Sequence, residues 1–133
     1  SMIREPDELG HAITEMREKI YQTKKPAEGK LINTKYSRGC MVDIEFLVQY
    51  WVLKYANKFA SLTERTDNAG LISELHHLGL INDGDLQLLD CYPTFHKWLH
   101  EQVLQNQSAE ISSELVRNEI EIVKACWNKT FNS

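Results

Sequence analysis

The fold of this chain is decided by the stretch Lys35-Tyr-Ser-Arg-Gly-Cys-Met-Val-Asp-Ile-Glu-Phe-Leu-Val-Gln-Tyr-Trp-Val-Leu-Lys-Tyr-Ala56, in which a short polar turn runs into an apolar helix. The large apolar residues fall on nearly every side of this helix, and a helix of that kind belongs in the middle of a bundle. Asp43, Glu45 and Gln49 are set into its first turns. Because a buried carboxylate is costly unless it is partnered, these residues mark the place to look for function.

Four other segments have apolar residues at the spacing of an amphipathic helix. They cover residues 7–22, 68–78, 86–104 and the stretch from Ser108 to the end of the chain. Their expected buried stripes are Leu9, Ile13, Met16 and Ile20; Leu71, Leu75 and Leu78; Leu86, Leu89, Tyr92, Phe95, Leu99, Val103 and Leu104; and Ile111, Leu115, Val116, Ile120, Val123, Trp127 and Phe131. Together with a central helix over residues 41–58, they predict one all-α domain over residues 1–133, an up-and-down bundle of about five helices.

Short polar signals place the ends of these helices. Thr66 or Asp67 is expected to cap the helix over 68–78, Gly79 to end it, and Ser108 to cap the last helix. Pro93 lies inside the helix over 86–104, where we expect a kink and not a break because the apolar stripe stays in phase on both sides.

Residues 23–37 form a connector, since Lys24, Lys25, Pro26 and Gly29 stop the first helix. The segment Leu31-Ile32-Asn33-Thr34 has strand character but no evident strand partner in the chain. With Ser1 standing ahead of Met2 as a cloning residue would, this unpaired segment suggests a piece of a longer protein. Ser37 or Gly39 is expected to cap the central helix.

The overall composition is that of a soluble globular protein, with 42% hydrophobic and 26% charged residues. A net charge of −4 gives no reason to expect a nucleic-acid partner. No apolar run reaches the roughly 20 residues that span a bilayer, and the charges near the start exclude a signal peptide. Three cysteines at wide spacing, Cys40, Cys91 and Cys126, predict neither a disulfide framework nor a zinc site. We therefore expect a cytoplasmic protein with reduced thiols.

The strongest candidate for chemistry is the segment from Lys35 to Gln49. Lys35 and Arg38 bring positive charge to a turn that opens a helix, and such an end attracts phosphate. Asp43 and Glu45 are two residues apart, so they point about 200° away from each other and cannot form one tight pair. Glu45 and Gln49 share a face. Spacing alone favours a structural reading, in which Asp43 complements the helix dipole and Glu45 has a cationic partner.

Two weaker patterns favour structural readings as well. Asp83-Gly84-Asp85 resembles a pair of Mg²⁺-binding aspartates, but no strand precedes it, so a cap and turn before the fourth helix is favoured. His96 and His100 are four residues apart, but Lys97 stands where a zinc protease needs its glutamate. These histidines, and the adjacent pair His76-His77, are expected at the surface. The chain contains no complete active site of its own, and no metal site is expected.

The pattern Lys35-x-x-x-Gly39-x-x-x-Asp43-Ile44-Glu45-Phe46-x-x-Gln49-Tyr50 resembles the motif of the glutamine synthetase adenylyltransferase family, bifunctional enzymes that add AMP to glutamine synthetase and remove it. Further similar segments are Glu15-Met16-Arg17-x-Lys19, Val52-Leu53-Lys54-Tyr55-Ala56, Leu62-Thr63, Thr66-Asp67-Asn68 and Leu115-Val116-Arg117 with Trp127. In one departure, Cys40 replaces the second glycine of a pair. If the family needs bare backbone there for a phosphate, Cys40 weakens that role; if the glycine only allows close packing, a small cysteine suffices.

The family has two halves, each a nucleotidyltransferase palm followed by a helical bundle, and this chain is similar to the bundle of the second, adenylylating half. The resemblance implies that Mg²⁺ and ATP are held on an upstream palm, where a tyrosine of glutamine synthetase attacks the α-phosphate, while the bundle closes one wall of the cleft. It implies that Lys35, Arg38, Gly39 and Gln49 face the nucleotide. Asp43 and Glu45 would position metal, ribose or the incoming hydroxyl. The bundle alone is expected to be inactive and to bind no cofactor, and the Leu31 to Thr34 segment would pair with the palm sheet.

Two alternatives stay open. The bundle could instead be a non-catalytic interaction module that docks glutamine synthetase or the PII regulatory protein, with Asp43 and Glu45 as satisfied structural groups. Burial discriminates, because a site needs Lys35, Asp43 and Glu45 on one exposed face. The other alternative is the uridylyltransferase that modifies PII, whose palm is related, although the Asp43-Ile44-Glu45-Phe46 helix argues against it.

Overall fold

The elements follow one another in a single helical bundle. A computed structural model describes residues 6–24, 31–65, 67–106 and 110–132. In chain order the elements are α1 (Pro6–Lys24), β1 (Leu31–Asn33), α2 (Met41–Tyr55), the 3-10 turn η1 (Ala60–Glu64), α3 (Asn68–His77), the single-turn α4 (Asp83–Leu86), α5 (Leu88–Leu104), β2 (Glu110–Ser112), the 3-10 turn η2 (Ser113–Val116) and α6 (Arg117–Phe131).

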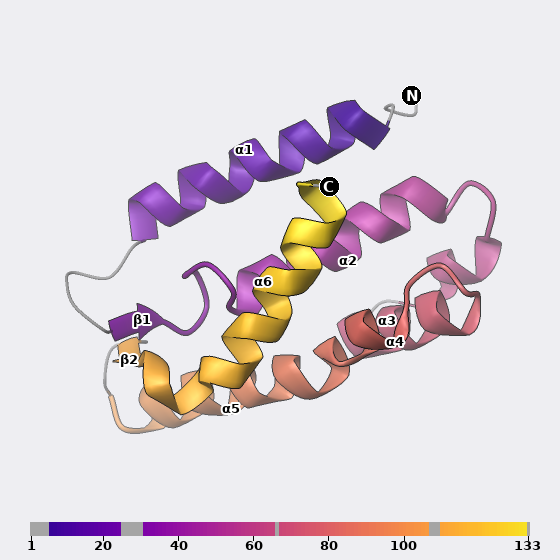
Figure 1. The fold of residues 1–133 in the computed structure, drawn as a ribbon. Coiled ribbons are helices and arrows are strands. Elements are labelled where there is room, and N and C mark those ends of the chain that lie inside the picture. Colours follow the sequence, from indigo (N-terminus) through magenta and orange to yellow (C-terminus); the bar gives the residue numbers. More distant parts are fainter. Residues whose placement is uncertain (1–5, 25–30, 66, 107–109, 133) are drawn as a thin grey trace.

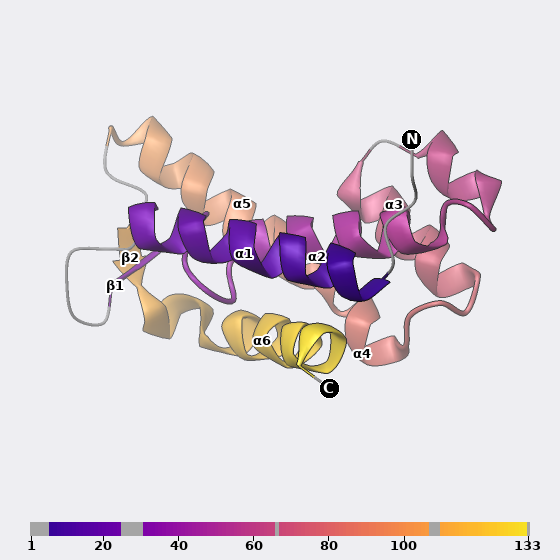
Figure 2. The same cartoon turned by 90° about the horizontal axis from the view of Figure 1, so that it is seen from above.

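Helix α2 lies at the centre, as its apolar residues predict. It packs against α1, α3, α5 and α6, and its buried residues include Ile44, Leu47 and Trp51. The chain runs along α1, back along α2, reverses for α5 and reverses once more for α6, while α3 and α4 lie near the carboxyl end of α2 (Figure 1). Seen from above, α1 lies lengthwise over α2 (Figure 2). The prediction of an all-α, up-and-down bundle is confirmed.

The segment from Leu31 has a strand partner within the chain, so the expectation of an unpaired strand was wrong. β1 pairs antiparallel with β2, and Ile32 lies opposite Ile111. Their apolar spacing predicts residues 110–112 in the last helix, but they alternate half-buried, buried and half-buried, which is the pattern of a strand with one face on the core. Helix α6 therefore begins at Arg117, and Leu115, expected in the core, is 51% exposed. The expected cap Ser108 lies outside the described residues.

The inner face of α1 also differs from the expected stripe. Leu9 and Ile13 are buried, but Met16 is 51% exposed and its place is taken by Arg17, whose side chain is only 13% exposed. Arg17 is four residues after Ile13 and eight after Leu9, so it is in phase with both on the helix. A cation in that position was the signal, present in the sequence, of a buried ionic contact.

Several of the predicted helix ends are confirmed. The Asp67 carboxylate accepts a hydrogen bond from the Gly70 amide and caps α3, and Gly79 follows α3 with a φ of +77°. Helix α5 runs unbroken through Pro93. None of the helices among the described residues is both long and apolar enough to cross a bilayer.

The start of α2 differs from expectation. Its N-cap is Cys40, whose side chain makes no capping hydrogen bond, and not Ser37 or Gly39. The chain before the helix folds back instead, so that backbone carbonyls cap the first amides. Side chains with good capping chemistry were therefore not needed at this end.

Candidate functional site

Asp43 is fully buried, and its negative charge is compensated by partners inside the fold. The Arg17 guanidinium donates to both carboxylate oxygens, with Nε to Oδ1 at 3.0 Å and Nη2 to Oδ2 at 2.6 Å. The Gly39 amide also donates to Oδ2, at 2.7 Å. A two-pronged arginine contact is the geometry that best offsets the desolvation of a buried carboxylate. Asp43 therefore joins α1, α2 and the turn before α2.

Arg17 extends this connection to a third helix. Its guanidinium lies over the ring of Trp127 in α6, 4.0 Å from the ring centroid. A cation stacked on an aromatic face is attracted by the negative charge of that face. We call Arg17, Gly39, Asp43 and Trp127 the Asp43 cluster. The sequence pattern points to Asp43 and Gly39 but does not indicate the partner of Asp43, Arg17, which lies 26 residues earlier.

Gly39 is required by the backbone and by packing together. Its φ of +80° is in the left-handed region, and a Cβ built there would lie 2.8 Å from Cγ2 of Ile120 and 3.1 Å from the Ile120 carbonyl oxygen. Cys40 has an ordinary φ of −111° and is buried. The replacement of a second glycine by Cys40 thus needs no special backbone, which supports the close-packing reading of this position.

The amides that open α2 are bonded within the chain. The Met41 amide donates to the Thr34 carbonyl at 3.3 Å, and the Val42 amide donates to the Lys35 carbonyl at 2.8 Å. A phosphate at this helix end would have to displace those carbonyls. The Met41 and Val42 amides therefore already have acceptors and do not need an anion. The nucleotide-facing role of Lys35, Arg38, Gly39 and Gln49 stays a prediction.

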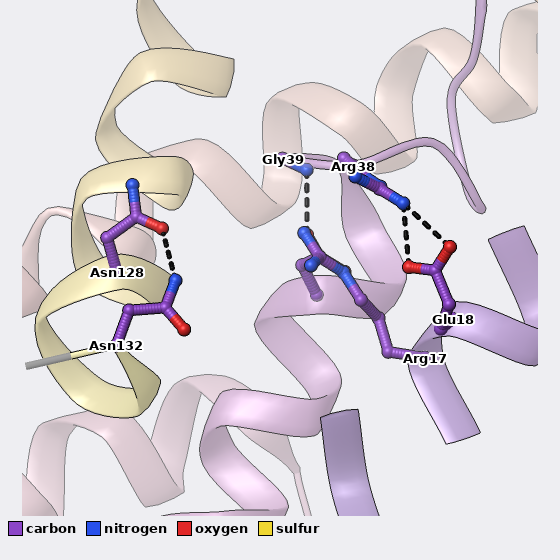
Figure 3. Close-up of polar contacts among 7 residues, drawn as sticks. Arg17, Glu18, Arg38, Gly39, Asn128 and Asn132 are labelled. Carbon is purple, nitrogen blue, oxygen red and sulfur yellow. Dashed lines mark hydrogen bonds and ion pairs between the residues drawn. The ribbon is translucent and has the colours of Figure 1, made fainter. Parts of the chain in front are cut away.

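Lys35 and Arg38 lie at the edge of the same turn and engage neighbouring side chains. The Lys35 ammonium is 5.4 Å from the Tyr36 ring centroid. Arg38 donates to the two oxygens of Glu18 at 2.6 and 2.9 Å, a pair drawn in Figure 3, and stacks on Tyr21 at 4.2 Å. A hydrogen bond from Gln22, and the charge of Arg38, lower the pKa of Glu18.

Glu45 lies on another side of α2. It is half-buried, and its Oε2 accepts a hydrogen bond from the Tyr92 hydroxyl of α5 at 2.8 Å, while Gln49, one turn later, is exposed. Burial, followed by the hydrogen bond to Glu45, raises the pKa of Tyr92. We call Glu45, Gln49 and Tyr92 the Glu45 face. Glu45 and Gln49 thus lie on one side of α2, as their spacing predicts, and Asp43 lies on another.

The Asp83-Gly84-Asp85 segment forms the first turn of α4 directly after the N-cap Asn82, which agrees with the cap and turn favoured from sequence. Asp85 is buried, forms a capping box with Asn82 and accepts a bond from the Lys129 ammonium, whereas Asp83 is exposed and contacts His76. Across the described ranges, no three histidine, cysteine or carboxylate side chains are placed to hold a metal ion. Since Asp43 is also neutralised by Arg17, the described residues do not fit a Mg²⁺ site.

Two histidines and three cysteines complete the set of candidate groups. His96 and His100 are exposed, as expected. Cys40, Cys91 and Cys126 are free buried thiols, and burial raises the pKa of both Cys91 and Cys126 to about 12. At neutral pH such thiols are poor nucleophiles, because the reactive species is the thiolate.

The chain is similar along nearly its whole length to one segment of larger curated proteins, each named "Bifunctional glutamine synthetase adenylyltransferase/adenylyl-removing enzyme". The relative from Idiomarina loihiensis is 33% identical over 129 residues, the one from Thioalkalivibrio sulfidiphilus 32% over 127, and the one from Burkholderia pseudomallei 34% over 127. These matches cover 94–96% of this chain but only 13–14% of each relative. No protein-family model matches the chain.

Proposed function

This chain is homologous to one segment of the bifunctional glutamine synthetase adenylyltransferase/adenylyl-removing enzymes, and from that relation we propose that it is the helical domain of an enzyme that transfers AMP from ATP to glutamine synthetase. The observation that carries the proposal is the sequence identity of 32–34% in alignments that cover 94–96% of the chain. A bundle with its own core, built around α2, can act as a rigid wall beside a catalytic domain.

The two carboxylates of the shared motif have different parts in this proposal. Asp43 holds the wall together, because its oxygens are taken up by Arg17 and Gly39. Glu45 and Gln49 reach the surface, so they are the residues that would look onto a cleft and position a ribose or an incoming hydroxyl. The resemblance implies the same positioning role for Asp43, but both of its carboxylate oxygens are buried and none faces solvent.

Mg²⁺ and ATP belong to another part of the parent enzyme in this proposal. The described side chains do not fit a metal site, and the resemblance implies two metal-binding aspartates on an upstream palm. The chain by itself would then transfer no AMP. Its own contribution to the reaction would be positioning by the Glu45 face.

A second candidate is a docking module for glutamine synthetase or the PII regulatory protein. It is favoured by the burial of Asp43 with Arg17 and by the bond between Tyr92 and Glu45, which give both carboxylates partners inside the fold. In this candidate the Glu45 face contacts the partner protein and has no influence on the reacting atoms.

Kinetics of the full-length enzyme separate the two. AMP transfer to glutamine synthetase would be measured for the parent protein and for Glu45→Ala, with Glu101→Ala, an exposed carboxylate on α5, as the matched control. A cleft wall predicts a lower kcat for Glu45→Ala with an unchanged KM for glutamine synthetase, while docking predicts the reverse. If the parent protein transferred no AMP to glutamine synthetase, the proposed function would be wrong.

A further inference from the structure

A cavity of about 280 Å³ lies on the α6 side of the turn before α2, between β1, that turn, η2 and α6. Its charged lining residues are Arg38, Arg117, Lys124 and Glu121, and Ile32 and Ile120 form an apolar wall. Three cations with one carboxylate concentrate positive charge in one place on a chain whose net charge is −4. We call this cavity the cation pocket.

The geometry of α6 explains why its charges meet there. Arg117, Glu121 and Lys124 are four and three residues apart, so they follow one face of the helix over two turns. Lys124 is fixed near its base, because its Cγ packs against the Gly39 turn, 3.1 Å from where a Cβ on Gly39 would lie. The close approach that requires a glycine at position 39 is therefore also the approach that brings Lys124 beside Arg38.

Arg38 and Arg117 differ in how far their charge is neutralised by a neighbouring carboxylate. Arg38 is held by the two oxygens of Glu18. Arg117 Nη1 lies 3.7 Å from Glu114 Oε2, beyond hydrogen-bond length, and both side chains are more than 60% exposed. An exposed pair of that geometry contributes little, so the guanidinium can turn to another anion at small cost.

We propose that the cation pocket binds a phosphate group of a small anionic molecule, with Arg117 and Lys124 as its main donors and Arg38 at the rim. A planar guanidinium matches two phosphate oxygens, and a lysine ammonium adds a mobile point charge. The volume lies just below the usual range of small-molecule sites, which suits a pyrophosphate or a short phosphate ester. This inference does not rest on the proposed function, because the pocket is apart from the Glu45 face, whose contact is with α5.

The test is a calorimetric titration of this chain with inorganic phosphate, pyrophosphate and ATP, each without Mg²⁺. We expect pyrophosphate to bind, and the double variant Arg117→Ala/Lys124→Ala to weaken binding by about tenfold or more. Lys97→Ala, which removes an exposed lysine of α5, is the matched control and should leave the affinity unchanged. Tighter binding of ATP than of pyrophosphate would show that the pocket prefers a nucleotide. Equal affinity would show that it recognises only the phosphate groups.

A second variant guards against loss of folding in the double variant. Glu121→Gln removes the one carboxylate that lines the pocket among the described residues, so it should strengthen pyrophosphate binding several-fold, an effect that a damaged fold would not produce. The inference is overturned if none of the three anions binds at millimolar concentration. It is also overturned if Lys97→Ala weakens binding as much as the double variant, or if Glu121→Gln leaves it unchanged.

Discussion

Asp43 and Glu45 are two residues apart on one helix, yet they belong to different environments. Asp43 is fully buried and accepts three hydrogen bonds from α1 and from the turn before α2. Glu45 is half-buried, accepts a bond from Tyr92 of α5, and stands one turn before the exposed Gln49. A rotation of about 200° between the two residues is enough to send one carboxylate inward and the other to the surface. Two acidic residues in one motif therefore need not share a task.

The environments also predict how each carboxylate responds to removal. A buried ion pair adds little to the stability of the fold compared with well-packed apolar residues. Removing one partner, however, leaves the other charge buried without a counter-charge, which is strongly destabilising. When the half-buried Glu45 carboxylate is removed, the Tyr92 hydroxyl that was bonded to it can form a hydrogen bond to water instead. Mutations in the Asp43 cluster should thus act on stability, and mutations in the Glu45 face should act mainly on function.

The largest effect is expected for Asp43→Ala. This change leaves the Arg17 guanidinium without its carboxylate and the Gly39 amide without its acceptor, and we expect a loss of about 3–5 kcal/mol in the free energy of unfolding. Urea denaturation followed by circular dichroism measures it. The double variant Arg17→Met/Asp43→Leu is the control and should lose much less, because no uncompensated charge remains. A loss below about 1 kcal/mol for Asp43→Ala would contradict the structural role.

Next in size is Gly39→Ala, which tests the turn that holds Asp43. The new methyl group would meet Ile120 at 2.8 Å in a left-handed backbone conformation, and we expect a loss of at least about 2 kcal/mol. Gly79→Ala is a matched control, since Gly79 has a similar φ of +77° but a Cβ built there would meet no described residue within 4 Å beyond its chain neighbours. It should lose only about 1 kcal/mol, so the difference between the two variants measures the packing of the turn against α6. Equal losses would mean that close packing is not what position 39 requires.

A smaller effect is expected for Glu45→Ala, which removes the acceptor of the Tyr92 hydroxyl. Because the site is half-exposed, we expect a loss of about 1 kcal/mol or less in the same denaturation experiment. Tyr92→Phe removes the other half of this hydrogen bond and should cost a similar amount. If Glu45→Ala destabilised the fold as much as Asp43→Ala, the contrast between the two carboxylates would not hold.

The smallest effect is a change in pH dependence at alkaline pH. The pKa of Tyr92 is raised above its ordinary value of 10.0 in the folded chain, chiefly by burial and then by the bond to Glu45. The stability linked to this shift is fully present below about pH 10 and is lost as the pH rises through the raised pKa. Tyr92→Phe should therefore remove part of the alkaline loss of stability seen in the unmodified chain. Identical alkaline slopes in the two proteins would contradict this assignment.

Much of the fold could be predicted because its determinants are local. The all-round apolar helix, the cap at Asp67 and the end at Gly79 depend on residues within a few positions of one another. The strand at residues 110–112 could not be predicted in the same way, since Ile111 fits the inner face of a helix as well as that of a strand. Pairing with Leu31 to Asn33, almost 80 residues earlier, decides between them.

The candidate site divides along the same line. Helical spacing already placed Asp43 and Glu45 on different sides and Glu45 beside Gln49, because a helix fixes those directions within one turn. Helical spacing does not predict that Arg17 forms the ion pair with Asp43. Nor does it predict that Arg117 and Lys124 line one cavity with Arg38. Each of these contacts joins residues from separate elements, so they exist only once the helices have packed.

The amino-acid sequence by itself determined the helices, the direction of each polar side chain on α2 and the resemblance to the adenylyltransferases. The tertiary structure alone decided which carboxylate is buried, which amides are already bonded and where positive charge collects. The physical reason is range. Backbone hydrogen bonds and helical periodicity act over about four residues, whereas the desolvation and pairing of a charge depend on whatever other elements bring against it.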